Sequence, residues 1–195
     1  MKRIVLLSVM FVLLCLGKGY GQFVEDFEGG IPADWATFKT LNGTPADSMG
    51  NVPGWGITTT GTLVCEGTTS AYIDRSNIGA GNVAEGWLVT PQITVPPNGR
   101  LYFTAKQTFA QDYGTKYIVR ISTTSQTDIS SFSEELELNE DQFSPLGWNT
   151  CFEHGVNPII DISDYSGLDV YIAFVKKDTQ PAAQPYADRW VLDMV

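Results

Sequence analysis

Residues 169–178, DVYIAFVKKD, contain the stretch that decides the fold class of this 195-residue chain. Apolar side chains recur there at every second position: Val170, Ile172 and Phe174 alternate with Tyr171, Ala173 and Val175. A period of two residues is typical of a β-strand, because successive side chains of a strand point to opposite faces. The stretch therefore predicts a half-buried strand.

Two further runs repeat this pattern, LYFTAK at residues 101–106 and YIVRIS at residues 117–122. Segments rich in Gly, Pro, Asn and Asp separate the apolar runs, and we expect loops there. These segments are LNGTPADSMGNVPGWG, SNIGAGN, VPPNG and DTQPAAQPYAD. Roughly ten short strands in one chain predict an all-β fold, a two-sheet β-sandwich of the jelly-roll kind.

One segment, SSFSEELELNEDQF at residues 130–143, has a helical composition. It predicts either a single helical turn or an acidic edge strand.

The first 21 residues predict a secretory signal peptide. Lys2 and Arg3 precede an apolar run from Ile4 to Leu16, and small residues at positions 19 and 21 suit cleavage before Gln22. The apolar run is shorter than the roughly 20 residues that a membrane-spanning helix needs. We therefore expect export, to the cell surface or the medium, without a transmembrane segment.

Residues 22–195 are expected to form a single domain of 174 residues. Removal of the signal peptide leaves 9 Lys and Arg against 22 Asp and Glu, a net charge of −13. Such a surface repels nucleic acid and anionic membranes, and it attracts divalent cations. Nucleic acid is therefore not an expected partner.

Two cysteines, Cys65 and Cys151, remain after cleavage. In an exported chain they are candidates for a disulfide, and otherwise they are two small buried apolar residues. For a disulfide we expect their Cα atoms about 4.4–6.8 Å apart.

The sequence favours a protein without catalytic activity. The single histidine, His154, has no visible nucleophile or second zinc ligand, so we interpret it as a polar surface residue. No glycine-rich segment has the spacing of a phosphate-binding loop. Paired carboxylates of a small glycosidase are the enzymatic alternative, but the acids of residues 134–141 are bunched in one polar run, as on a solvated face.

The aromatic residues divide into two groups. Trp35, Trp87, Trp148 and Trp190 lie in or beside apolar strand patterns and are expected in the core. Trp55, Tyr113 and Tyr186 lie in polar loops, and they are the candidates for an exposed aromatic platform that binds a ligand such as a sugar ring.

The order of several motifs resembles a known family. DFEGGIPADW, GWLVTPQITV, LYFTAKQ, YIVRISTTS, GWNT, DISDYSGLDVYIAFVKKD and WVLDMV follow one another as in the cleaved-adhesin and choice-of-anchor J modules of exported bacterial proteins, which also form the haemagglutinin/adhesin regions of the gingipains. The family is similar in plan to MAM and galactose-binding-like jelly rolls. The resemblance implies a non-catalytic β-sandwich that binds calcium and serves adhesion or ligand binding.

This chain departs from the family pattern in two places. The loop LNGTPADSMGN keeps a single acid, Asp47, where the family often has several, and the closing motif reads LDMV. A calcium site in that loop is correspondingly disfavoured.

The acids at the start of the chain predict a different calcium site. In the stretch FVEDFEGG, residues 23–30, alternation points Phe27 towards the core and leaves Glu28 at the rim. The family plan brings the first and last strands together, so that Asp193 approaches Glu28. These two acids, with Asp26 or Asp74 as helpers, are the predicted ligands of a structural Ca²⁺. Acids that cap strand ends in solvent are the alternative, and Arg189 or Lys39 is the alternative partner of Asp193.

The sequence as a whole predicts a secreted or cell-surface binding module for a host or matrix protein or a glycan. The alternatives are a small jelly-roll glycosidase and a spacer module that is joined to further modules of a larger surface protein.

Overall fold

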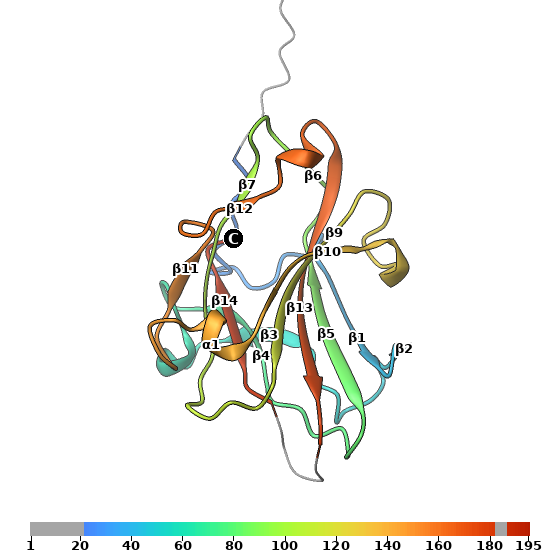
Figure 1. Cartoon of the computed structure of the whole chain (residues 1–195), viewed down its shortest axis with the longest axis vertical. Coiled ribbons are helices and arrows are strands. Elements are labelled where there is room, and N and C mark those ends of the chain that lie inside the picture. Colours follow the sequence, from blue (N-terminus) through green and yellow to red (C-terminus); the bar gives the residue numbers. More distant parts are fainter. Residues whose placement is uncertain (1–21, 182–186) are drawn as a thin grey trace, which may run out of the picture.

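Two antiparallel β-sheets face each other in the computed structural model, which describes residues 22–181 and 187–195 (Figure 1). The predicted signal peptide lies outside these residues. The larger sheet contains, in spatial order, β10 (Ser133–Leu138), β9 (Lys116–Ser122), β13 (Asp169–Thr179), β5 (Val83–Val89), β1 (Ala36–Leu41) and β2 (Thr44–Pro45), and β6 (Ile93–Thr94) pairs with one end of β13.

The facing sheet contains five strands. Their order is β11 (Phe152–His154), β8 (Phe103–Lys106), β14 (Trp190–Asp193), β4 (Ser70–Ile73) and β3 (Trp55–Thr58). A short pair, β12 (Ile160–Asp161) and β7 (Arg100–Leu101), lies beside it. The short helices are α1 (Glu140–Phe143), η1 (Gly61–Leu63), η2 (Ile129–Ser131) and η3 (Ser163–Tyr165). The predicted all-β sandwich is confirmed.

The main core lies between the sheets and is rich in aromatic residues. Trp190, fully buried on β14, makes edge contacts with Trp55, Tyr117 and Phe143 at ring-centroid distances of 5.3 to 5.5 Å. Such contacts add about 0.5–1.5 kcal/mol each beyond the burial of apolar area. The contact with Tyr117 of β9 fixes β14 against the opposite sheet, whereas Trp55 of β3 belongs to the same sheet as β14.

Three of the four tryptophans predicted to be buried are in the core, namely Trp35, Trp87 and Trp190. The prediction for Trp148 is wrong, because 53% of its surface is exposed. Trp148 lies in the irregular segment between α1 and β11, where a neighbouring strand pattern does not determine burial.

The prediction of half-buried strands is wrong for β8, β9 and β13, which are buried on both faces over most of their length. Ile118 and Val175 are buried, although they belong to the face opposite to the main core. They pack there in a second cluster with Trp87, against which Phe132 of the 123–132 loop lies at 5.5 Å. A loop that covers the outer face of a sheet removes the contrast between its two faces, so alternation in the sequence no longer reports exposure.

The segment at residues 130–143 contains both of the structures predicted for it, an acidic edge strand and a single helical turn. Residues 133–138 form β10, an edge strand of the larger sheet, and residues 140–143 form α1. Asn139 and Gln142 make reciprocal capping contacts at the start of α1, which explains why the strand ends there.

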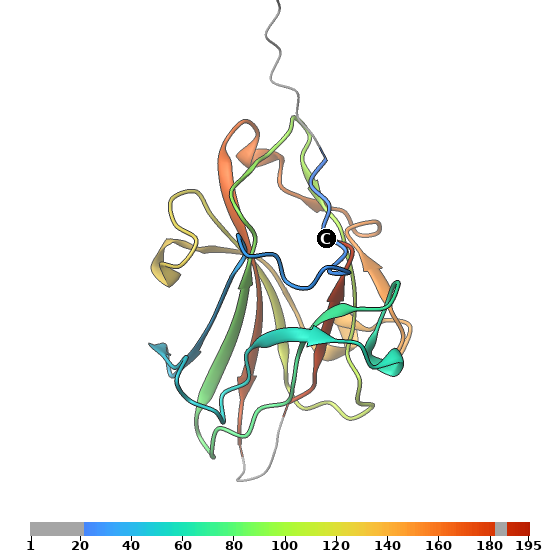
Figure 2. The same cartoon turned by 180° about the vertical axis from the view of Figure 1, so that it is seen from behind.

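The first described residues and the last strand lie side by side, as the family plan predicts (Figure 2). Glu25 and Val195 exchange backbone hydrogen bonds at 2.8 and 2.9 Å. Phe27 is fully buried and Glu28 is exposed, which agrees with the expected alternation of burial. The strand from which this alternation was predicted does not form, because residues 22–27 are irregular and Phe27 has a φ of +54°. The described residues contain no helix of sufficient length and apolar character to cross a membrane.

Candidate functional site

Glu28 is held by the loop of residues 65–70, which leads into β4. Its Oε1 accepts hydrogen bonds from the backbone N–H groups of Thr68 at 2.7 Å and Thr69 at 3.1 Å, and its Oε2 accepts one from the Thr68 hydroxyl at 2.6 Å. These bonds, the one from the Thr68 hydroxyl foremost, lower the pKa of Glu28. Gly67 has a φ of +58°, and a Cβ at this position would clash with the Glu28 carboxylate.

Asp193 contacts the same loop from the other end of the chain. Its Oδ2 accepts hydrogen bonds from the backbone N–H of Glu66 at 3.0 Å and from the Ser70 hydroxyl at 2.7 Å, and its Oδ1 accepts one from the Met194 N–H. Asp193 is fully buried, and burial raises the pKa of this carboxyl. Donors of the loop, and not Arg189 or Lys39, are thus its partners.

The structure brings Glu28 and Asp193 to one loop, but it does not bring Asp74 there. Asp193 stands opposite Ser70 at one end of the β4–β14 pair, whereas Asp74 follows Ile73 at the other end. Four residues of a strand span roughly 13 Å. Asp74 instead accepts a hydrogen bond from Arg189 Nε at 2.8 Å. Asp26 adjoins Glu28 and accepts a hydrogen bond from its backbone N–H at 3.0 Å.

The oxygens of Glu28 and Asp193 suit Ca²⁺, which prefers carboxylate and carbonyl oxygens. In each carboxylate one oxygen accepts two hydrogen bonds and the other accepts one, so each retains an unused lone pair. The described part of the chain contains no group of three or more His, Cys, Asp or Glu side chains placed around a metal ion. Carbonyls of the loop would have to complete the coordination, and the calcium site stays a prediction.

A disulfide anchors the loop of residues 65–70 to the β11 edge of the five-stranded sheet. Cys65 and Cys151 are bonded, and their Cα atoms are 5.7 Å apart. Cys151 directly precedes β11, so the bond ties the loop that holds both chain ends to an edge strand.

The three aromatic residues predicted to form a platform have different environments. Trp55 is not a platform, because it is buried, contacts Trp190, and donates a hydrogen bond from Nε1 to the Gly86 carbonyl at 3.0 Å. Tyr113 is half-buried, with the Arg75 guanidinium 4.6 Å from its ring centroid. Tyr186 lies outside the described residues.

His154 also differs from its prediction as a surface residue. It is buried on β11 between Phe103 and Phe143, with ring centroids 4.7 and 4.9 Å away. Burial lowers the pKa of His154 to about 4, so that the ring is neutral at physiological pH. It therefore packs as part of the core.

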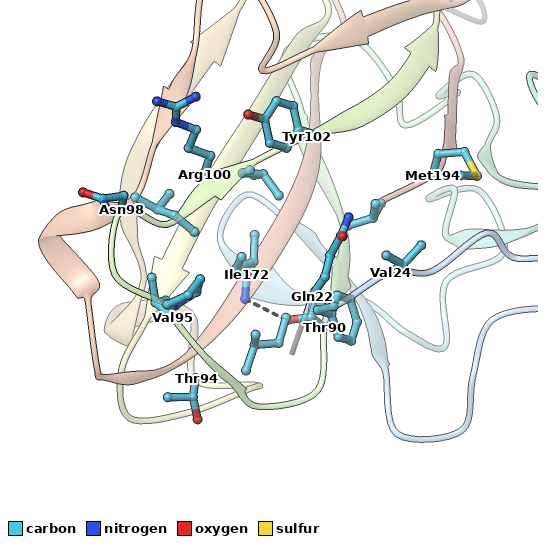
Figure 3. Close-up of a pocket in the computed structure, with 16 residues that line it drawn as sticks. Gln22, Val24, Thr90, Thr94, Val95, Asn98, Arg100, Tyr102, Ile172 and Met194 are labelled. Carbon is cyan, nitrogen blue, oxygen red and sulfur yellow. Dashed lines mark hydrogen bonds between the residues drawn. The ribbon is translucent and has the colours of Figure 1, made fainter. Parts of the chain in front are cut away.

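A cavity of about 470 Å³ lies at the end of the sandwich where residues 22–24 and 194–195 meet (Figure 3). Its volume is within the range of small-molecule sites. Its floor is apolar and includes Val95 and Ile172, and the buried Thr90 hydroxyl accepts a hydrogen bond from the Ile172 N–H at 3.0 Å.

The rim of this cavity carries three side chains that suit a hydroxyl-rich ligand. Tyr102 is 43% exposed, Arg100 lies beside it, and Asn98 lies further along the rim, and both of these are exposed as well (Figure 3). An aromatic ring stacks on the apolar face of a sugar, a guanidinium donates hydrogen bonds, and an amide both donates and accepts. None of the described residues that line the cavity is Asp or Glu.

Tyr102 was absent from the predicted site, although the sequence carries a signal for it. In LYFTAK, Tyr102 occupies the alternate position between Leu101 and Phe103, which are buried. The alternation thus indicated an exposed aromatic residue within a strand pattern, whereas the loop aromatics were favoured on composition alone.

Comparison with known proteins places the chain in a family. The family model described as the Cleaved Adhesin Domain matches residues 21–151. None of the curated proteins matches the chain.

Several solved structures share the fold. The K1 cleaved adhesin domain of Lys-gingipain from Porphyromonas gingivalis W83 is 21% identical, with a TM-score of 0.58, over 88% of this chain and 94% of that chain. The glycoside hydrolase domain of Endo-D from Streptococcus pneumoniae R6 is 17% identical, with a TM-score of 0.50, over 81% of this chain and 21% of that chain. A structure of carbohydrate-binding modules of the β-sandwich superfamily is 13% identical, with a TM-score of 0.51, over 87% and 60%. At such identities the likeness establishes the fold alone.

Proposed function

Because this chain belongs to the Cleaved Adhesin Domain family, we propose that it is an exported, non-catalytic adhesin-like module that binds a glycan at the cavity of Figure 3. The observation that carries the proposal is the exposed ring of Tyr102 on the rim of a cavity that Arg100 and Asn98 also line. The carbohydrate-binding modules among the structural neighbours support it, as does the net charge of −13, which disfavours anionic partners.

Hydrolysis of a glycan has less support. A glycosidase needs two facing carboxyl groups, one with a raised pKa, beside the bound sugar. Burial raises the pKa of Glu140, Asp188 and Asp193, but all three are buried and none lines the cavity of Figure 3. The likeness to Endo-D spans 21% of that chain.

The proposal includes the structural Ca²⁺ that the sequence predicts. Glu28 and Asp193 would hold the ion with carbonyls of the loop at residues 65–70, and the ion would neutralise two carboxylates there. Its role would be to fasten the two chain ends, next to the residues that line the cavity.

A glycan array probed with the purified protein tests the binding function. We expect specific binding, which Tyr102→Ala weakens by about tenfold, corresponding to about 1.4 kcal/mol. Trp148→Ala is the matched control, because Trp148 is also an exposed aromatic residue but does not line the cavity. Absence of any glycan ligand at sub-millimolar strength, or an equal loss in both variants, would contradict the proposal.

A further inference from the structure

A second concave surface lies on another side of the sandwich. A groove of about 410 Å³ runs between β10 and β11, and α1 lies beside it (Figure 1). β10 ends the order of strands in the larger sheet, and β11 ends the order in the facing sheet. The groove therefore occupies an open side of the sandwich, and it shares no residue with the cavity of Figure 3.

The groove is lined mainly by apolar side chains. Leu136 and Leu138 of β10 contribute one wall, and Phe152 of β11 and Ile160 of β12 contribute the other. Exposed apolar side chains extend this surface outwards, with Leu146 at 66% and Ile159 at 49% exposure. Contiguous exposed apolar surface of this kind is typical of an interaction site.

One wall of the groove is also a free strand edge. β10 pairs with β9 on one side, and in the described chain no strand pairs with its other side. An edge strand presents unpaired N–H and C=O groups to which a further strand can add. β10 is six residues long, with a bulge between Glu134 and Leu136, whereas β11 has three residues. The regular part that is open to a further strand is therefore Leu136–Leu138.

The charge of the groove selects among possible strands. Glu135 and Asp161 line it, and none of its described lining residues is Lys or Arg. Arg100 stands opposite Asp161 in the β7–β12 pair. The Glu135 carboxylate accepts hydrogen bonds from the hydroxyls of Tyr165 and Ser133, but it forms no salt bridge within the described residues, so its charge is not neutralised by a cation. Glu134 and Glu137 on the same strand add to this field, although they pair with Arg120 and Lys116. Like charges across a strand pair are destabilising, so β10 disfavours a second copy of itself.

We propose that this groove binds an extended segment of a partner protein, which adds to β10 as a further strand and carries alternating apolar and Lys or Arg side chains. The apolar side chains fill the groove, the basic side chains face the glutamates, and the backbone supplies the hydrogen bonds. This interaction is separate from the proposed binding of a glycan.

Synthetic peptides test the class of partner. The probe is a fluorescein-labelled peptide of four Val-Lys repeats, and its binding to the purified protein is followed by fluorescence anisotropy. We expect this peptide to bind and the matched Val-Glu peptide to show no binding. Methylation of alternate backbone nitrogens of the Val-Lys peptide retains its charge and removes its strand pairing, and it should weaken binding by about tenfold.

Two pairs of variants test the site. Ile159→Ser should weaken binding of the Val-Lys peptide by about tenfold, and Leu168→Ser, at the nearly equal exposure of 48%, should leave it unchanged. Glu135→Gln should weaken binding by about threefold more than Glu137→Gln, whose wild-type carboxylate already pairs with Lys116. Tyr102→Ala should not affect the peptide, which separates this site from the glycan site.

Four outcomes would overturn the proposal. They are equal binding of the Val-Glu or the N-methylated peptide, equal losses in the two Ser variants, no binding at millimolar peptide, and a dimer in sedimentation that Ile159→Ser dissociates. The last result would make a second copy of this chain the occupant of the groove.

Discussion

One disulfide connects the loop at residues 65–70 to the residue that precedes β11, a wall of the groove beside β10. The polar groups of the loop and those of the groove nevertheless have opposite environments. In the loop, the carboxylates of Glu28 and Asp193 each accept hydrogen bonds from loop donors. In the groove, the outer edge of β10 has no strand partner within the described residues. The difference indicates that the first region stabilises the fold, whereas the second is available to a ligand.

Among the changes that test this difference, removal of the disulfide should have the largest effect on the stability of the protein. The double variant Cys65→Ser, Cys151→Ser should lower the free energy of unfolding by about 4 kcal/mol, because the bond restricts the long chain segment between the two cysteines in the unfolded state. Urea unfolding measures the change. The wild-type protein under reducing conditions is the control and should match the double variant. An unchanged free energy of unfolding would show that the loop is held without the bond.

Calcium should have the next largest effect on stability, and it should act only at the loop of residues 65–70. If Ca²⁺ binds only the native state, a hundredfold excess over its dissociation constant adds about 2.7 kcal/mol of stability. We expect the melting temperature in millimolar Ca²⁺ to exceed that in EDTA, and Glu28→Gln and Asp193→Asn each to abolish the difference. Asp74→Asn should retain it, because Asp74 lies at the other end of β4. A wild-type melting temperature that does not change would remove the calcium site.

The dependence of stability on pH should be the smallest effect. It should distinguish Glu28 from Asp193, the two acids that contact the loop. Burial raises the pKa of Asp193 above 3.8, so its contribution to stability is present below that value and is lost as the pH rises through the folded pKa. Hydrogen bonds lower the pKa of Glu28 below 4.5, so its contribution is present above that value and is lost as the pH falls.

Urea unfolding of the wild type, Asp193→Asn and Glu28→Gln between about pH 3 and 6 tests these signs. The stability of the wild type relative to Asp193→Asn should decrease with rising pH, and its stability relative to Glu28→Gln should increase. Slopes of the same sign would show that one of the two carboxyl groups has a different environment from the one described.

The strands and the burial of Phe27 were predictable from the sequence, because both depend on local alternation between apolar and polar positions. The two forms of residues 130–143 were also predictable, since acidic edge strands and capped helical turns have local signatures. The burial of Trp55 and His154 was not. Each lies in a polar segment of the sequence, and each is covered by residues distant along the chain, Trp190 for the former and Phe103 for the latter.

The sequence by itself determined the class of fold, which follows from periodicity, and the resemblance to the family, which follows from the order of motifs. The resemblance also implied that Glu28 and Asp193 approach each other, and both bind the loop at residues 65–70. Tertiary structure alone decided where ligands have access. Tyr102 lines a cavity only because segments near residues 22, 95, 172 and 194 meet around it, and the groove exists only because two sheets end side by side at β10 and β11. Surfaces formed by segments distant in sequence leave no periodic signal in any one of them.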